Sequence, residues 1–261
     1  MPEATVQITV HNHVATLTLD DPARRNAMTP ELGDAFRDAV NRVKGDAGVR
    51  AVVVTGAGAA FSGGGDLRML ERLRTVTPDE SRRFMLEFYA KYLSVTELDV
   101  PTVAAVQGAA IGAGLCVALA CDLCIVDEHA KLALNFVQLG LHPGMGATYL
   151  APRRAGAMRG AELLLTGRRF DGKEAVHLGM ALRAVPVDQT LLQATELAEH
   201  IARNAPLAVK ALRSELGIDR DALQKALERE AYFQAESYAS NDLGEGLKAA
   251  AEKRAPNFVG A

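Results

Sequence analysis

Two glycine-rich segments of this chain have the composition of turns that join a buried strand to a helix. The first, Phe61–Asp66 (FSGGGD), follows the apolar run Val52–Val54. The second, Gln107–Gly114 (QGAAIGAG), follows the apolar run Val103–Val106. Such turns leave backbone N–H groups without partners at the start of a helix, where they can hold an anion or a developing oxyanion. If the two turns converge, their amides can polarise one carbonyl oxygen.

Nucleotide-binding turns are the alternative that these glycines raise. The first turn lacks the Gly-Lys-Ser/Thr ending with which a P-loop reaches phosphate and magnesium, so it does not predict a P-loop. The second turn follows a strand, and Asp127 stands where the ribose-binding acid of a dinucleotide site would lie. However, the segment between Gly114 and Cys121 is short for a helix that crosses between parallel strands. A dinucleotide-dependent oxidoreductase is therefore a distant alternative.

The elements around the turns follow from hydrophobic periodicity and from helix-start signals. Alternating apolar and polar residues over 6–19 predict a β-hairpin. A threonine followed by proline and an acid, at Thr29 and again at Thr77, predicts a helix start, and the second helix is expected to run to about Leu98. All-apolar strands are expected at 52–54, 103–106 and 123–126, as in a sheet covered on both faces.

Strand and helix signals alternate up to about residue 187, and helices alone follow. We expect helices at 114–120, 157–166, 172–178, 191–203, 220–238 and 243–253. The change predicts an α/β core over residues 1–195 and a helical region over 196–261. Leu223, Leu227 and Phe233 of that region are expected to be apolar contacts for self-association.

Composition excludes several kinds of partner. The chain has 261 residues, 49 % of them hydrophobic and 23 % charged, and a formal net charge of -3, so it gives no electrostatic case for nucleic acid or an anionic membrane surface. No apolar run reaches the roughly eighteen residues of a membrane span, and the N-terminus has no signal-peptide pattern. We therefore expect a cytoplasmic protein.

Three cysteines lie close together in an apolar stretch: Cys116, Cys121 and Cys124. An odd, clustered set does not resemble a secreted disulfide framework. The spacing of Cys121 and Cys124 could suit a metal, but a second ligand pair is missing. We expect buried free thiols, which behave as small hydrophobic groups, and no metal site.

The order and spacing of several motifs resemble the crotonase (enoyl-CoA hydratase/isomerase) superfamily. Phe61–Leu67 is similar to its first oxyanion-hole motif, and Pro101–Gly108, continuing to Asp122, is similar to its second. The likeness covers nearly the whole chain, because the segments 21–28, 140–146, 161–168 and 252–258 also match. Each motif alone is a weak indication of the superfamily, whereas the order and spacing of all of them together are a specific one.

The resemblance implies an α/β fold built as a spiral of ββα turns, with a C-terminal helical region that builds trimers, often paired into hexamers. It implies acyl-CoA thioesters as ligands and no separate cofactor, because CoA is part of the substrate. By motif position, the backbone N–H groups of Gly63 and Ala113 are expected to hold the thioester oxygen. These two amides would stabilise the enolate or oxyanion through which the chemistry of such thioesters passes.

The CoA moiety is expected at two other places in the chain. By the same resemblance, the loop that carries Arg24, Arg25 and Ala27 would approach the nucleotide end of CoA, and arginine suits its phosphates. Phe258 would pack on the adenine across a subunit boundary.

The sequence departs from the family at the two glutamates that hydratases use. The motif alignment places Cys116 and Phe136 at those positions. Water addition needs a base and an acid, and neither a thiol of ordinary pKa nor a phenyl ring supplies them at neutral pH. His142, on a loop framed by glycine and proline, is a candidate proton-transfer group that can act near pH 7.

Two functions of different classes follow. The first is an enzyme of the hydratase/isomerase group, a lyase or isomerase of acyl-CoA metabolism with non-standard proton-transfer residues. The second is a binding protein that kept the oxyanion hole and lost the chemistry. Ordinary hydratase activity is not expected from this template.

Overall fold

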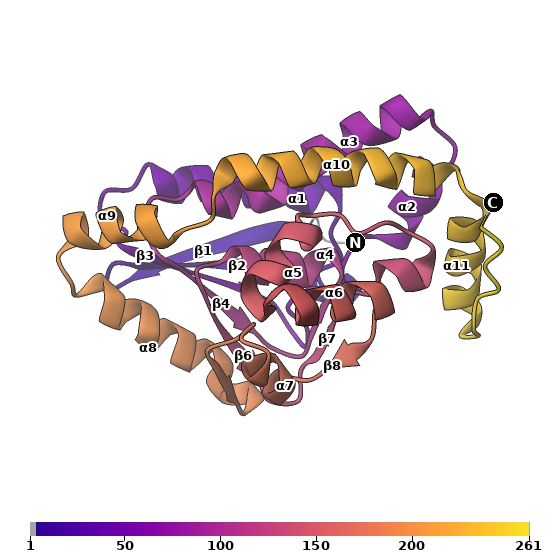
Figure 1. Cartoon of the computed structure of the whole chain (residues 1–261). Coiled ribbons are helices and arrows are strands. Elements are labelled where there is room, and N and C mark those ends of the chain that lie inside the picture. Colours follow the sequence, from indigo (N-terminus) through magenta and orange to yellow (C-terminus); the bar gives the residue numbers. More distant parts are fainter. Residues whose placement is uncertain (1–3, 261) are drawn as a thin grey trace.

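The computed structural model describes residues 4–260, whose strands form two sheets (Figure 1). Within this range the larger sheet has six strands in the order β1-β2-β3-β4-β6-β9, in which β1 is antiparallel to β2 and the other neighbours are parallel. Their bounds are Thr5–His11 (β1), Val14–Asp20 (β2), Ala51–Gly56 (β3), Thr102–Val106 (β4), Leu123–Asp127 (β6) and Arg183–Val185 (β9). The expected hairpin over 6–19 is confirmed as β1 and β2.

The smaller sheet has three strands, in the order β5-β7-β8. It consists of β5 (Ala109–Ile111), β7 (Lys131–Ala133) and β8 (Arg169–Phe170). An isolated bridge between Ser62 and Ala110 joins the first glycine-rich turn to its edge. One turn of the chain thus gives β4 to the larger sheet, β5 to the smaller sheet and then helix α4 (Ala113–Ala120), and the next turn begins with β6 and β7. This repeat is a spiral of ββα turns.

Helices cover both faces of the larger sheet. α8 (Thr190–Ala202) packs its small residues Ala194 and Ala198 against one face, and α1 (Pro30–Lys44) and α4 lie on the other. All residues of β3 and β4 are buried as a result. This confirms the expectation of strands without a solvent-facing side, which their unbroken apolar sequences had indicated.

Both predicted helix starts are confirmed. Thr29 caps α1, and Thr77 caps α3 (Pro78–Tyr92) in a reciprocal pair with the Glu80 side chain. The second helix is shorter than expected, because a 3-10 turn (η2, Leu93–Glu97) replaces its last residues. The hydroxyls of Ser94 and Thr96 bond back to carbonyls three residues earlier, and such bonds compete with the α-helical pattern.

The remaining elements are helices and 3-10 turns, most of them in the C-terminal half of the chain. They are α2 (Leu67–Leu73), α5 (Ala147–Ala155), α6 (Ala157–Thr166), α7 (Gly172–His177), α9 (Pro206–Leu216), α10 (Arg220–Ala239) and α11 (Asn241–Glu252), with 3-10 turns η1 (Pro22–Arg24), η3 (Phe136–Leu139) and η4 (Val187–Gln189). α4, α6, α7, α8, α10 and α11 begin and end within two residues of the expected helices, whereas α9 was not expected.

The C-terminal helices fold onto the core of their own chain. α10 lies along α3 (Figure 1), and the expected boundary at residue 195 falls within the continuous helix α8. Leu223 and Leu227 are only 4 % and 6 % exposed, since they pack in the main hydrophobic cluster. The expectation that these two leucines face another subunit is therefore wrong, whereas Phe233 is 44 % exposed.

Candidate active site

The two glycine-rich turns converge. The Ser62 N–H donates to the Ala109 carbonyl at 3.0 Å, and the Ile111 N–H donates to the Ser62 carbonyl at 3.1 Å. A methyl group on Gly114 would lie 2.6 Å from the Cβ of Ser62, so only glycine lets α4 approach this closely. The segments that precede α2 and α4 are thereby joined at one place.

Two of the three glycine amides of the first turn are bonded within the protein. The Gly63 N–H donates to the Arg25 carbonyl at 2.8 Å, and the Gly64 N–H donates to the Ser62 hydroxyl at 3.2 Å. The expectation that Gly63 offers a free amide is therefore wrong, because that amide fixes the turn to the Asp21–Met28 loop. The Gly65 N–H has no acceptor among the described residues, and Gly65 lines the cavity described next.

Ala113 lines the same cavity. It is the first residue of α4, after the N-cap Gly112, where helical N–H groups have no intrahelical acceptor. No other acceptor for it occurs within residues 4–260. Gly65 and Ala113 therefore come from two helix-leading turns, line one cavity, and carry amides without an acceptor among the described residues.

This cavity of about 240 Å³ is predominantly apolar, and we call it the acyl cavity. Its wall includes Leu70, Met85, Phe88, Ile111 and Met145. Among the described residues that line it there is no Asp, Glu, His, Lys or Arg. An uncharged alkyl or alkenyl chain fits such a wall, whereas an ionised group would lose hydration there without a partner.

Two side chains lie against the start of α4. A Cβ built on Gly112 would be 3.7 Å from Cζ of Phe136 and 3.8 Å from Oδ1 of Asn135. Phe136 is thus beside the Ala113 amide, at the position where the family alignment expects a proton-transfer group. Its phenyl ring fills that position with apolar surface.

Three polar side chains that line the acyl cavity form a buried cluster. Tyr89 on α3 donates its hydroxyl to Oε1 of Gln234 on α10 at 2.7 Å, and the Tyr238 hydroxyl lies 3.4 Å from the same oxygen. Burial raises the pKa of both phenols well above their ordinary value. Neither hydroxyl is a base near neutral pH.

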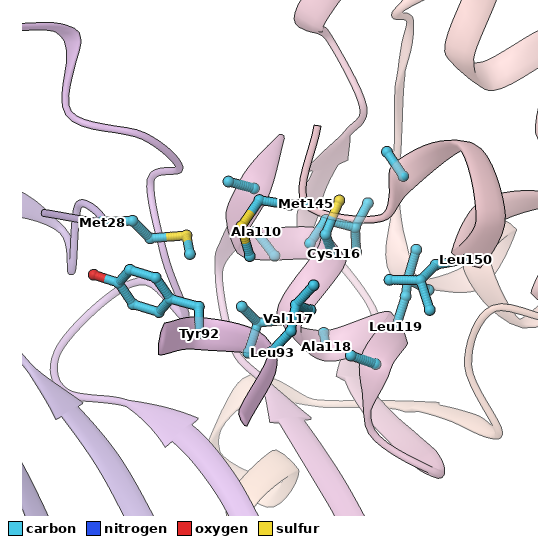
Figure 2. Packing of buried hydrophobic residues seen from close by; sticks show 14 of the residues in the cluster. Met28, Tyr92, Leu93, Ala110, Cys116, Val117, Ala118, Leu119, Met145 and Leu150 are labelled. Carbon is cyan, nitrogen blue, oxygen red and sulfur yellow. The ribbon is translucent and has the colours of Figure 1, made fainter. Parts of the chain in front are cut away.

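Cys116 does not line the acyl cavity. Figure 2 shows it among buried apolar side chains, near Met145 and Val117. Its Sγ lies 3.8 Å from the Gly144 carbonyl. Burial, and secondarily the negative charge of Glu230, raise the pKa of this thiol well above its ordinary value. Cys116 is therefore an inert thiol rather than a nucleophile or base, and Cys121 and Cys124 are likewise buried and free.

His142 also lies outside the acyl cavity. Its Nδ1 is 2.7 Å from the Pro143 carbonyl, and its ring packs on Phe233 with centroids 5.1 Å apart. Burial lowers the pKa of His142, so the imidazole is neutral at pH 7. Because the ring belongs to the contact with α10, the geometry contradicts the expectation that His142 transfers protons at the site.

The loop expected at the CoA nucleotide is anchored by a residue that sequence reasoning passed over. Asn26 is fully buried, and its side-chain amide bonds to the carbonyls of Ala57 and Ala60. Arg24 is tied to Asp21 in a 2.6 Å ion pair.

Arg25 is the arginine of this loop that lines a cavity. With His129 and Lys131 it lines a cavity of about 320 Å³ next to the first glycine-rich turn, which we call the basic cavity. The basic cavity offers cationic groups that suit a phosphate ester.

Asp127 does not have the environment of a ribose-binding acid. Its carboxylate accepts the Gly108 N–H at 3.3 Å and the His129 N–H at 2.9 Å, and its side chain is buried. The dinucleotide-like spacing of the second turn thus reflects turn packing. Phe258 lies on the C-terminal tail, which Asp242 holds to α11 through the Val259 and Gly260 amides.

Several site residues were not found from the sequence. Gly65 was passed over because motif position alone does not reveal which of three consecutive glycine amides is already bonded. Tyr89, Gln234 and Tyr238 come from helices distant in sequence. The i, i+4 spacing of Gln234 and Tyr238 is a usable signal, since it places polar groups on one helix face.

Comparison with known proteins identifies the family. Residues 9–261 match the model of the enoyl-CoA hydratase/isomerase family. A probable enoyl-CoA hydratase of Mycobacterium tuberculosis is 39 % identical over 232 residues, covering 85 % of this chain and 89 % of that protein. The chain therefore belongs to the enoyl-CoA hydratase/isomerase family, the crotonase superfamily, as the sequence motifs had indicated.

Solved structures agree with this assignment. An enoyl-CoA hydratase/isomerase from Pseudoalteromonas atlantica superposes with a TM-score of 0.84 at 30 % identity, over 98 % of this chain and all of that one. An enoyl-CoA hydratase from Bacillus halodurans gives 0.87 at 26 % identity, over 94 % of this chain and 100 % of that one. The crotonase fold, with its C-terminal helices, is confirmed. In the part of the chain described, no helix has both the length and the apolarity that crossing a bilayer requires.

Proposed function

We propose that this protein binds acyl-CoA thioesters and polarises the thioester carbonyl between the amides of Gly65 and Ala113. The observation that carries the proposal is that these two unpaired amides line one apolar cavity. In a site that excludes water, aimed N–H dipoles stabilise the negative charge that develops on the oxygen of an enolate. Family membership supports a CoA thioester as the ligand.

The site supports enolate formation better than hydration. Hydration needs a group that activates water and one that protonates carbon. The acyl cavity holds no carboxylate among its described residues, and Phe136 occupies the position beside the Ala113 amide. We therefore expect slow or absent hydration and an enzyme whose reaction does not depend on a cavity carboxylate. A non-catalytic acyl-CoA-binding protein is the second candidate, and the same lack of carboxylates favours it.

The basic cavity is the proposed place of the CoA phosphates. Arg25 and Lys131 supply its cationic groups and His129 adds an imidazole, while Arg24 supports the loop through Asp21 and Ala27 continues it toward the first turn. No separate cofactor is required for this role. Phe258, 39 % exposed, is proposed to contact the adenine in an assembled oligomer.

We further propose a homotrimer, alone or paired into a hexamer, located in the cytoplasm. α9 supports self-association because its apolar residues Leu207, Leu212 and Leu216 are 83 %, 58 % and 69 % exposed in the single chain. Such a row of exposed leucines is typical of a surface that another chain covers. Light scattering coupled to size-exclusion chromatography measures the assembly directly.

Calorimetry and turnover together test the function. Octanoyl-CoA should bind more tightly than CoA, because only the former fills the acyl cavity, and crotonyl-CoA should be hydrated far below about 1 s⁻¹. Equal affinities for octanoyl-CoA and CoA would refute acyl binding at this cavity. Rapid hydration would refute the inference that the missing carboxylates matter.

A further inference from the structure

One face of α10 carries polar side chains toward the loop that follows η3. Gln234 donates from Nε2 to the His142 carbonyl at 2.9 Å, and Ser237 accepts the His142 N–H at 3.0 Å. One turn earlier, Glu230 reaches the end of the same loop. We call Leu141–Thr148 the cavity loop, because its Leu141 and Met145 line the acyl cavity.

Glu230 makes the strongest of these contacts. One carboxylate oxygen accepts the Gly146 N–H at 2.7 Å. The other accepts the Thr148 N–H at 2.8 Å and the Thr148 hydroxyl at 2.6 Å. The side chain is buried, so three short bonds to one carboxylate hold the backbone without competition from water.

The conformation held in this way is unusual. Met145 has φ +61° and is followed by Gly146 at φ +75°. A left-handed conformation costs a methionine about 1 kcal/mol or more relative to its ordinary regions. It persists where surrounding contacts impose it, and here it directs Met145 into the acyl cavity.

We propose that Glu230 is a positioning residue that shapes the acyl cavity by fixing the cavity loop and, through it, Met145. The inference rests on the proposed binding of the acyl chain in that cavity. Glu230 lines neither the acyl cavity nor the turns that carry the Gly65 and Ala113 amides. It should therefore change the affinity for the acyl chain and leave the affinity for the CoA moiety unchanged.

The charge of Glu230 gives the proposal a distinctive readout. Burial raises the pKa of Glu230 to about 7, against the opposing effect of the Thr148 and Gly146 hydrogen bonds. The titratable and charged groups around it are Tyr89 from α3, Cys116 from α4 and Arg229 on its own helix. Tyr89 and Cys116 stay neutral between pH 5.5 and 8.5, and His142 of the cavity loop, whose pKa burial lowers, is neutral at pH 7 and above. Glu230 is therefore the buried group at this contact whose charge changes near pH 7.

Protonation of Glu230 replaces one acceptor with a donor, which opposes the Gly146 and Thr148 N–H groups. The ionised form should therefore hold the cavity loop better than the neutral form. The affinity for octanoyl-CoA, relative to that for CoA, should rise as the pH increases through about 7. If α10 contributed to the affinity through packing alone, the ratio of the two affinities would not change with pH.

The test compares Glu230→Gln with the wild type by calorimetry at several pH values from 5.5 to 8.5. Glutamine keeps the shape but sets an N–H₂ group against the backbone donors. We expect at least a fivefold weaker affinity for octanoyl-CoA at pH 8, an unchanged affinity for CoA, and no pH dependence of the ratio. Glu228→Gln, at an exposed position of α10, should behave as the wild type.

The outcomes separate the two proposals. If the wild type binds octanoyl-CoA no more tightly than CoA, the proposed function fails and this inference fails with it. If it does bind more tightly, but Glu230→Gln keeps the same ratio and pH profile, only the inference is overturned. Should the variant not fold, the backbone ¹⁵N resonance of Gly146 in the wild type replaces it: a midpoint near pH 7 supports the inference, and a flat profile overturns it.

Discussion

Replacement of Gly65 by proline removes the backbone N–H that we propose as an oxyanion donor. Proline has no backbone N–H. The Gly65 N–H has no acceptor among the described residues, so the substitution removes no internal hydrogen bond. Gly65→Ala is a matched control, because a Cβ there would meet only the Met69 methyl group, at 4.0 Å, and the amide is kept.

The expected loss follows from the energetics of oxyanion donors. One such donor is worth about 3–4 kcal/mol of transition-state stabilisation, equivalent to roughly 10²–10³ in rate. The exchange of α-hydrogens of bound octanoyl-CoA with D₂O proceeds through the enolate, so its rate should fall by that factor in Gly65→Pro. The infrared carbonyl band of a ¹³C-labelled thioester should also move back toward its position in water.

The control and a neighbouring variant decide what the result means. Gly65→Ala should retain both the exchange rate and the carbonyl shift. Gly63→Pro should instead lower thermal stability, because it breaks the bond to the Arg25 carbonyl. A carbonyl shift that survives in Gly65→Pro would refute the assignment of this amide.

Three further predictions concern proton transfer and stability. Phe136→Glu should raise crotonyl-CoA hydration at least about tenfold over Phe136→Gln, because it adds a general base beside the Ala113 amide; equal rates would contradict that placement. Arg213→Ala should reduce the free energy of unfolding by about 2 kcal/mol in denaturant titrations, since it leaves the half-buried Asp122 without its 2.9 Å partner. The pKa of Glu230 rises from 4.5 to about 7 on folding, so the folded state binds this proton more tightly and the stability should fall as pH rises through that window. The loss is on the order of 3 kcal/mol at pH 8, and Glu230→Gln should remove it; an identical stability profile in the variant would argue against the shift.

Local signals in the sequence predict most of the fold. The hairpin, the Thr-Pro helix starts and the apolar strands β3 and β4 follow from alternation, capping chemistry and burial, which act over a few residues. The end of α3 was misjudged because the hydroxyls of Ser94 and Thr96 redirect the backbone into a 3-10 turn. That competition depends on rotamers that a sequence does not display.

The site was predictable only as far as its motifs extend. The two glycine turns followed from the sequence pattern and Ala113 from the family resemblance, whereas the choice between Gly63 and Gly65 depends on which amide meets the Arg25 carbonyl. His142 was a candidate by residue type and Cys116 by its position in the family motif, and neither lines the acyl cavity. The contacts of Glu230 and Gln234 depend on how α10 packs on the core, which the sequence pattern does not show.

The attachment of α10 to the core bears on how assembly and ligand binding can be studied separately. Gln234 and Tyr238 line the acyl cavity, and Leu223 and Leu227 fill the interior of their own subunit. A chain shortened at residue 195 would therefore lose its binding chamber together with any quaternary contacts. Polar replacements of Leu207 and Leu212, which project from α9 into solvent, offer a way to obtain a monomer with its interior intact.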